Sequence, residues 1–183
     1  MRPRASAFIA TSLDGFIARP DGSIDWLDDA QGLIPEGEDC GYLEFMASID
    51  GLVMGRHTFE RVLSFDAWPY GHLPVFVLSH APVAIPIDLS ASVHSVQATP
   101  GDLVARLGRE GFRHLYVDGG QTIQGFLRAG LLDDITVTVV PVLLGAGRPL
   151  FGPLDHDVEL TLMHSRAYAF GFVQSMYRNE ATG

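Results

Sequence analysis

Short apolar runs typical of strands alternate with helical segments over the first two thirds of the chain, and this alternation limits the possible folds most strongly. Residues 74–78 are continuously apolar, as in a strand buried on both faces, and residues 5–11 are typical of another buried strand. Later in the chain the runs 135–140, 158–167 and 170–178 follow one another with little helix between them. We therefore predict an α/β fold whose mixed, mostly parallel sheet is flanked by helices and has an antiparallel C-terminal edge.

The expected helices are recognised by the spacing of their apolar residues and by the residues at their ends. Residues 38–49 have helical spacing, with Glu38 and Asp39 in the expected first turn, where acids suit the helix dipole. We expect further helices at 58–64, 100–110 and 120–130, and short strands at 51–54, 92–96 and 114–117. No repeat, linker or low-complexity tract interrupts this pattern, so we expect a single domain over residues 1–183.

Composition argues against several kinds of partner. The chain has 22 acidic residues against 12 basic ones, a formal net charge of −10, and an acidic surface repels nucleic-acid phosphates. Cys40 is the single cysteine, so no internal disulfide can form, and no metal-ligand spacing accompanies it. The uncharged run between Asp134 and Arg148 contains Pro141 and is too short to span a bilayer, and Asp14 interrupts the N-terminal apolar stretch. We expect a cytoplasmic protein with no nucleic-acid, membrane or metal partner.

Two expected strands end in glycine just before a helix. The strand at 114–117 leads to Gly119 and Gly120, and glycine lets the backbone approach a phosphate while the helix N-terminus offers unpaired N–H groups. The strand at 51–54 leads to Gly55 and Arg56, whose guanidinium fork matches phosphate geometry. Each ending alone is equally compatible with an ordinary strand-to-helix turn.

A third expected strand, 74–78, is followed by a hydroxyl and an imidazole, those of Ser79 and His80. In α/β folds, ligands bind outside the carboxyl ends of the strands. Three strand ends that carry hydrogen-bond donors and basic side chains therefore predict a phosphate-bearing ligand lying across that edge of the sheet.

Five short motifs, in order along the chain, carry a resemblance to a known family. They are residues 12–18 (SLDGFIA), 25–27 (DWL), 54–60 (MGRHTFE), 117–120 (VDGG) and 141–147 (PVLLGAG). With them the chain resembles the dihydrofolate reductase fold, and most closely the reductase C-terminal domain of the bifunctional deaminase-reductase of riboflavin biosynthesis. Each motif alone is weak, but five in register over nearly the whole chain are specific.

The resemblance implies an NADPH cofactor lying across the sheet. Residues that would hold the adenosine 2′-phosphate are Arg56, Ser79 and His80. Residues that would hold the pyrophosphate are Thr58 and the backbone of Gly119, Gly120, Gln121 and Thr122, and Gly55 is a further cofactor-binding residue. Residues that would lie along the nicotinamide are Ala10, Ile17 and Ala18, with the loop 14–26 closing over it to exclude water.

The resemblance also implies a proton source and a substrate pocket. Folate-reducing relatives place a carboxylate on the helix before the Gly-Arg strand, and counting back without gaps from Gly55 reaches Asp39, which could relay a proton or bind a pterin-like ring. The alternative is that Asp39 only suits the start of a helix. Candidates for substrate contact are Trp26, Tyr42 and Thr138, and for each of them plain packing or strand preference is the alternative.

The implied function is hydride transfer from NADPH to a small pteridine- or pyrimidine-like heterocycle, as in a 5-amino-6-(5-phosphoribosylamino)uracil reductase. The chain departs from the riboflavin enzyme because it has no deaminase domain and no basic cluster for a substrate ribose phosphate. Dihydrofolate reduction is an alternative, as are a nucleotide-binding module without turnover and a structural dimer without cofactor. The resemblance further implies a homodimer, with the glycine- and proline-rich segment 145–152 at the subunit contact.

Overall fold

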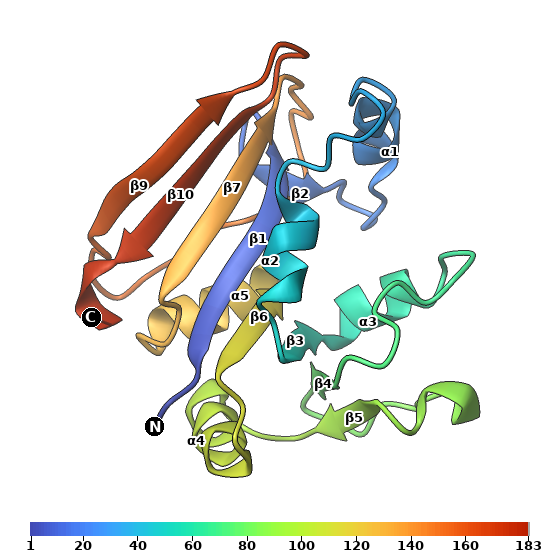
Figure 1. Ribbon diagram of the computed structural model, residues 1–183, viewed down its shortest axis with the longest axis vertical. Helices are drawn as coiled ribbons and strands as arrows, with labels where there is room; N and C mark the ends of the chain where they lie inside the picture. Colours follow the sequence, from blue (N-terminus) through green and yellow to red (C-terminus); the bar gives the residue numbers. More distant parts are fainter. Residues whose placement is uncertain (183) are drawn as a thin grey trace.

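An eight-stranded sheet runs through the whole structure, a computed structural model that describes residues 1–182 (Figure 1). The strand order is β5-β4-β3-β6-β1-β7-β10-β9. The strands are β1 (Arg4–Ser12), β3 (Gly51–Gly55), β4 (Val75–Leu78), β5 (Val93–Val96), β6 (His114–Asp118), β7 (Asp134–Val140), β9 (Leu160–Ala167) and β10 (Val173–Asn179). Gly183, the last residue of the predicted domain, lies outside the described residues.

The pairing of the strands confirms the predicted sheet. Strands β5, β4, β3, β6, β1 and β7 are paired in parallel, whereas β10 runs antiparallel to β7 and to β9. The helices are α1 (Asp25–Gln31), α2 (Tyr42–Ala47), α3 (Arg56–Val62), α4 (Pro100–Glu110) and α5 (Gly120–Arg128), with two 3₁₀ turns at Ile87–Leu89 and Glu180–Thr182. None of the helices within residues 1–182 is long and apolar enough to cross a membrane.

Helices cover both faces of the central strands, which explains why those strands are apolar without alternation. On β3, Val53 packs into one core cluster while Leu52 and Met54 pack into another on the opposite face. The first cluster also holds the apolar sides of α4 and α5, and the second holds those of α2 and α3. Side chains of both faces are buried, as the continuous apolar runs predict.

A third core cluster lies at the carboxyl end of β7 and at the turn between β9 and β10. It joins Trp26 and Ala30 of α1 to Val140, Tyr168 and Phe172. Cys40 also belongs to this cluster, and it is the one described non-glycine residue with a positive φ, 55°. The cluster therefore fastens α1 and the start of α2 to the C-terminal strands.

The predicted helix at 38–49 is too long at its N-terminus. Helix α2 begins only at Tyr42, because Cys40 and Gly41 have φ values of 55° and 81°, which a right-handed helix cannot accommodate. Glu38 and Asp39 therefore precede the helix instead of forming its first turn. The predicted helix at 58–64 begins earlier, at Arg56 directly after β3.

The predicted loop between β1 and residue 28 contains two ordered elements. Its β2 (Phe16–Ala18) pairs antiparallel with β8 (Arg148–Pro149), and α1 follows. The carboxylate of Asp14 accepts hydrogen bonds from the backbone N–H groups of Leu144 (3.1 Å) and Gly145 (2.8 Å). These contacts fasten the loop to the segment after β7.

Candidate active site

The carboxyl ends of β4, β3 and β6 lie side by side at one edge of the sheet. Gly55 is in register with Leu78 of β4, and Met54 is in register with Asp118 of β6. The residues directly after these positions are Arg56, Ser79 and Gly119, so the three expected phosphate-binding positions come together at this edge.

Glycine and threonine residues pack closely against one another where β3 and β6 end. Gly119 has a φ of 88°, and a Cβ there would collide with the hydroxyl of Thr58. A Cβ on Gly55 would stand 3.0 Å from the hydroxyl of Thr122. The backbones at the starts of α3 and α5 thus approach more closely than side chains would allow.

Helix α5 presents free N–H groups at this point. Its N-cap residue is Gly119, and no side chain caps the helix there. An uncapped helix N-terminus attracts anions through its unpaired amide groups and through the helix dipole. Gln121, in the first turn, is exposed, whereas Thr122 is buried. The arrangement can therefore hold a phosphate or diphosphate group.

The basic and polar side chains next to this position are open to solvent. The side chain of Arg56 is 46% exposed, and its Nε lies 3.6 Å from the carboxylate of Glu60. The hydroxyl of Ser79 accepts a hydrogen bond from the N–H of Ala81 at 3.3 Å, and His80 is exposed. Arg56 and the two residues after β4 are free to meet an anion that approaches from solvent.

The residues expected along a nicotinamide lie beside the same glycines. A Cβ on Gly120 would stand 2.8 Å from Cδ1 of Ile17, so β2 lies against the start of α5. Ala18 is buried and Ala10 is half-buried. In the β1–β7 register Ala10 stands opposite Thr138. Ile17 is thus the nicotinamide candidate that lies against the glycine turn.

Asp118, the last residue of β6, is a candidate that the sequence did not single out. It is half-buried, and desolvation raises the pKa of its carboxyl group to about 6. The hydrogen bond from the N–H of Gly119 (2.8 Å) and the hydroxyl of Tyr116 oppose this rise in the pKa only in part. A carboxyl group with such a pKa can donate or accept a proton near neutral pH.

Three tyrosines of the second core cluster interact electrostatically with this carboxyl group. The charge of Asp118 raises the pKa values of Tyr42, Tyr70 and Tyr116, and burial raises them further as the larger cause; the pKa of Tyr42 reaches about 12. The hydroxyl of Tyr116 donates to the carbonyl oxygen of Phe8 at 2.9 Å. These hydroxyls therefore stay protonated near neutral pH.

Asp39 has different surroundings. Its two oxygens accept hydrogen bonds from the N–H groups of Leu43 (2.7 Å) and Gly41 (2.9 Å). These bonds lower the pKa of its carboxyl group, so it keeps its charge. The geometry is that of a carboxylate capping the start of α2, which was the alternative interpretation of this residue. Its assignment as the proton source stays a prediction without support from these contacts.

The three expected substrate contacts do not share one cluster, because Tyr42 and Trp26 belong to different core clusters and Thr138 to neither. Tyr42 packs edge-on against Phe8, with ring centroids 5.7 Å apart, in the same cluster as Tyr116. Trp26 is buried in the third cluster, and its indole N–H has no hydrogen-bond partner. Thr138 is buried and accepts a hydrogen bond from the side-chain amide of Gln174 at 2.9 Å. Of the three, only Tyr42 therefore lies in the core cluster that contains Tyr116 of β6.

Comparison with known proteins gives the family. Residues 4–174 match the sequence model of the RibD C-terminal domain. The chain belongs to the RibD C-terminal domain family. The resemblance and the dihydrofolate reductase-like α/β fold inferred from the sequence are thereby confirmed.

Three relatives illustrate the range of this RibD C-terminal domain family. A Shewanella sp. PV-4 protein, provisionally assigned to riboflavin biosynthesis, is 41% identical; the match covers 98% of this chain and 99% of that one, with a TM-score of 0.90. The uncharacterized protein YwjB of Bacillus subtilis (strain 168) is 34% identical over 92% of this chain and 94% of YwjB. The third is the diaminohydroxyphosphoribosylaminopyrimidine deaminase/5-amino-6-(5-phosphoribosylamino)uracil reductase of Thermotoga maritima, which is 13% identical. The match covers 97% of this chain and 57% of the Thermotoga maritima chain, with a TM-score of 0.71.

These comparisons establish a RibD reductase-like fold for the chain. The likeness to the Thermotoga maritima protein shows the fold alone, and it involves only part of that longer protein. The sequence did contain one signal for the overlooked Asp118. This residue is the single acid at the end of an otherwise apolar strand, within the motif at residues 117–120.

Proposed function

We propose that this RibD C-terminal domain protein is an NADPH-dependent reductase of a small pteridine- or pyrimidine-like heterocycle. The observation that carries the proposal is the meeting of Arg56, Thr58 and Gly119 at adjoining strand ends, beside the protonatable carboxyl group of Asp118. Anion-binding groups and a proton source are what a hydride transfer followed by protonation requires of a protein.

The residues present fit a dinucleotide phosphate. Gly55 and Gly119 let the backbone at the starts of α3 and α5 pack closely against Thr122 and Thr58, and the uncapped start of α5 offers amide donors to a pyrophosphate together with Thr58. The exposed guanidinium of Arg56, with Ser79 and His80, would bind the 2′-phosphate that distinguishes NADPH from NADH. The reduced nicotinamide supplies the hydride when it is bound.

The chain's own groups would orient the rings and exclude water. Ala10, Ile17 and Ala18 offer a small apolar surface next to the glycine turn. The loop that carries β2 is held over this surface by its pairing with β8 and by the contacts of Asp14. A dry, fixed contact between reacting rings favours hydride transfer.

Asp118 is the residue that we assign to proton supply, in place of Asp39. Its carboxyl group has a pKa of about 6 because it is desolvated, so a protonated fraction is available near neutral pH. The charge of Asp118 influences the pKa of Tyr42, and we therefore keep Tyr42 as a candidate for substrate contact. Hydrogen-bonding hydroxyls around a carboxyl group suit a planar heterocycle with ring nitrogens and carbonyl oxygens.

The experiment that tests this function measures turnover and binding separately. The loss of NADPH absorbance is followed with a panel of oxidised pteridines and pyrimidines, and NADPH binding is followed by quenching of tryptophan fluorescence. A Trp26→Phe variant assigns the quenching to Trp26 or to Trp68. Binding with consumption of NADPH supports the reductase.

Two other outcomes would lead to different functions. Binding of NADPH without turnover on any substrate of the panel would favour a nucleotide-binding module that lacks catalysis. Unchanged fluorescence on addition of NADPH would contradict the cofactor assignment and leave a structural role. Turnover with dihydrofolate alone would replace the proposed substrate class by the folate alternative.

A further inference from the structure

A hollow of about 360 Å³ lies between the loop that carries β2 and one face of α3. Its lining includes Gly22 of the loop, His57 and Arg61 of α3, and Arg148 of β8. None of these groups belongs to the phosphate positions described above. No run of basic residues marks the hollow in the sequence, because its cations come from segments that are far apart in the chain.

Arg61 brings an unsatisfied guanidinium to this hollow. Its Nε is buried and has no hydrogen-bond partner among residues 1–182. Arg106 also has a buried Nε without a partner, but the carboxylate of Glu110 lies 3.5 Å from it. None of the ion pairs formed by the described part of the chain includes Arg61 or Arg148. A buried N–H group without an acceptor costs free energy, so an acceptor brought by a ligand is favoured here.

The guanidinium of Arg148 is fixed against the loop. A Cβ on Gly22 would stand 2.9 Å from Nη2, 3.0 Å from Cζ and 3.1 Å from Nη1 of this side chain. The turn that holds Gly22 is closed by two backbone hydrogen bonds of 2.9 Å, from Gly22 to Arg19 and from Arg19 to Ser23. Arg148 is therefore held in place before any ligand arrives, which lowers the entropic cost of binding.

The acids beside the hollow have partners of their own. The carboxylate of Glu60 lies 3.4 Å from Nδ1 of His57 and 3.6 Å from Nε of Arg56. The carboxylate of Asp21 accepts a hydrogen bond from the N–H of Ser23 at 2.9 Å. Two guanidinium groups are thus left without a counter-charge, on a chain whose net charge is −10.

We propose that the hollow is a binding site for a small oxyanion of the phosphate class, held by Arg61 and Arg148 with His57 beside them. Guanidinium groups form paired, charge-assisted hydrogen bonds with such oxygens. A bound oxyanion joins the loop to α3, because Arg148 is fixed to the loop and Arg61 belongs to the helix. This is a third anion position, separate from the two that the proposed function gives to NADPH.

The oxyanion has two possible sources. It is either free in solution or a group carried by the reducible substrate. The second source rests on the proposed function, whereas the binding of the anion does not.

Titration of the cofactor-free protein with inorganic phosphate tests the site directly. Phosphorus NMR at constant ionic strength gives the Kd, in an Arg56→Ala background that removes the other guanidinium assigned to a phosphate. Arg61→Met and Arg148→Met should each raise this Kd about tenfold or more, because a charge-assisted hydrogen bond is lost. Arg128→Met, on the exposed last turn of α5, removes the same charge elsewhere and should leave the Kd unchanged.

Two glycines of the loop provide a matched test that removes no charge. Gly15 and Gly22 have φ values of 83° and 91°, so an alanine strains the backbone similarly at either position. A Cβ on Gly15 meets no atom within 4 Å, whereas a Cβ on Gly22 displaces the guanidinium of Arg148. Gly22→Ala should therefore raise the phosphate Kd by up to about tenfold, and Gly15→Ala should leave it unchanged. Equal weakening in both variants would attribute the loss to backbone strain and remove Arg148 from the site.

Competition experiments separate the sources of the anion. With NADPH at saturation, phosphate that competes with the substrate assigns the oxyanion to the substrate, and phosphate that binds together with the substrate is a free ligand. Either result supports the site. Displacement by NADPH of the phosphate that Arg148 binds would give these groups to the cofactor, and the third position would fail.

The proposal is wrong if phosphate does not bind, or if the Arg61, Arg148 and Arg128 variants share one Kd. Melting temperatures of all variants check that a weaker affinity is not a failure to fold. The titrations use neither NADPH nor a substrate, so a protein that turns over no substrate can still have the site, and a working reductase can lack it.

Discussion

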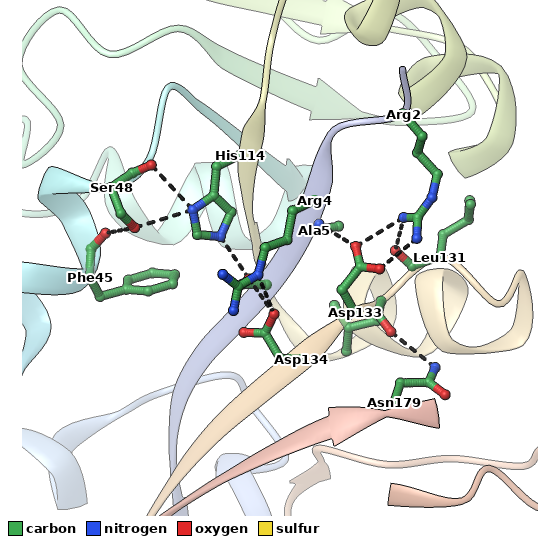
Figure 2. A network of polar contacts seen from close by, with 12 residues as sticks. Arg2, Arg4, Ala5, Phe45, Ser48, His114, Leu131, Asp133, Asp134 and Asn179 are labelled. Carbon is green, nitrogen blue, oxygen red and sulfur yellow. Dashed lines mark hydrogen bonds and ion pairs between the residues drawn. The ribbon is translucent and has the colours of Figure 1, made fainter. Parts of the chain in front are cut away.

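The polar residues at the two ends of strands β1 and β6 differ in how fully they are paired. At their amino ends Nε of Arg4 lies 2.7 Å from the carboxylate of Asp134, and the hydroxyl of Ser6 lies 2.9 Å from that carboxylate and 2.8 Å from Nε2 of His114. Figure 2 shows this network, in which each charged group faces a partner. At the carboxyl end of β6, Asp118 has one backbone hydrogen bond and a raised pKa.

The difference separates groups that hold the fold from groups that are available to a ligand. Paired and hydrogen-bonded polar groups stabilise a structure, whereas a desolvated acid with few partners costs stability and suits chemistry. Substitutions at the amino end should therefore affect unfolding, and substitutions at the carboxyl end should affect binding or turnover. The predictions below test this division in order of expected effect.

The largest effect is expected for Asp118→Asn. The amide has nearly the same shape but no acidic proton, so turnover should fall by about 10²- to 10⁴-fold, the usual contribution of general acid catalysis. Steady-state oxidation of NADPH with a reducible substrate measures this loss. NADPH affinity should be retained, and Asp39→Asn serves as the matched control. A larger loss of turnover in Asp39→Asn would return the role to the sequence-based candidate.

At the amino end, Asp134→Ala should lower the free energy of unfolding by about 2–3 kcal/mol, because it leaves Arg4 and Ser6 without their shared acceptor. Urea denaturation measures the change. The exposed Asp155→Ala is the control and should differ little from the wild type. An equally small change in Asp134→Ala would mean that this network does not stabilise the fold.

Arg56→Ala should weaken NADPH binding by about 1.5–3 kcal/mol, tenfold or more, because a charge-assisted pair with the 2′-phosphate is lost. NADH affinity should change much less, since NADH lacks that phosphate. Fluorescence titration of both nucleotides gives the ratio. Arg128→Ala, on the exposed last turn of α5, is the matched control. Equal weakening of the two nucleotides would contradict the assignment of Arg56.

The same Asp118→Asn variant should be more stable than the wild type at pH 7. The folded-state pKa of Asp118, about 6, is above the ordinary value of 3.8, so the folded state binds the proton more tightly. The stability that this carboxyl group contributes is present below about pH 4 and is lost as the pH rises through 6. Removing the buried charge should raise the free energy of unfolding by about 1–3 kcal/mol at neutral pH.

The smallest effect is expected at His114, in the amino-end network. Burial, followed by the charge of Arg4, lowers its pKa below the ordinary 6.5, while Asp134, Ser48 and Asp50 oppose this shift. The neutral ring thus contributes stability above pH 6.5, and this stability is lost as the pH falls through the folded-state pKa. His114→Asn should make the free energy of unfolding decline less steeply over this pH range, by less than about 1 kcal/mol. Melting temperatures measured across the range check this. If the decline is unchanged in the variant, groups other than His114 cause it.

Much of the site could be predicted because it depends on local chain geometry. Gly55 and Gly119 stand where strands end and helices begin, and that pattern is visible along the chain. Asp39 and Asp118 show where this reasoning stops. Both are acids next to apolar segments, and nothing in the neighbouring residues tells which one accepts hydrogen bonds from the backbone at the start of α2 and which one is desolvated.

The amino acid sequence by itself determined the parallel sheet, the antiparallel C-terminal edge and the set of strand ends that meet. These follow from hydrophobic periodicity and from glycine positions, which act over a few residues. Only the tertiary structure decided the surroundings of Asp118, the packing of Trp26 in the core and the exposure of β9. Desolvation and burial are set by segments that are distant in sequence, because Tyr42, Tyr70 and Tyr116 pack into one core cluster only when the sheet has brought their elements together.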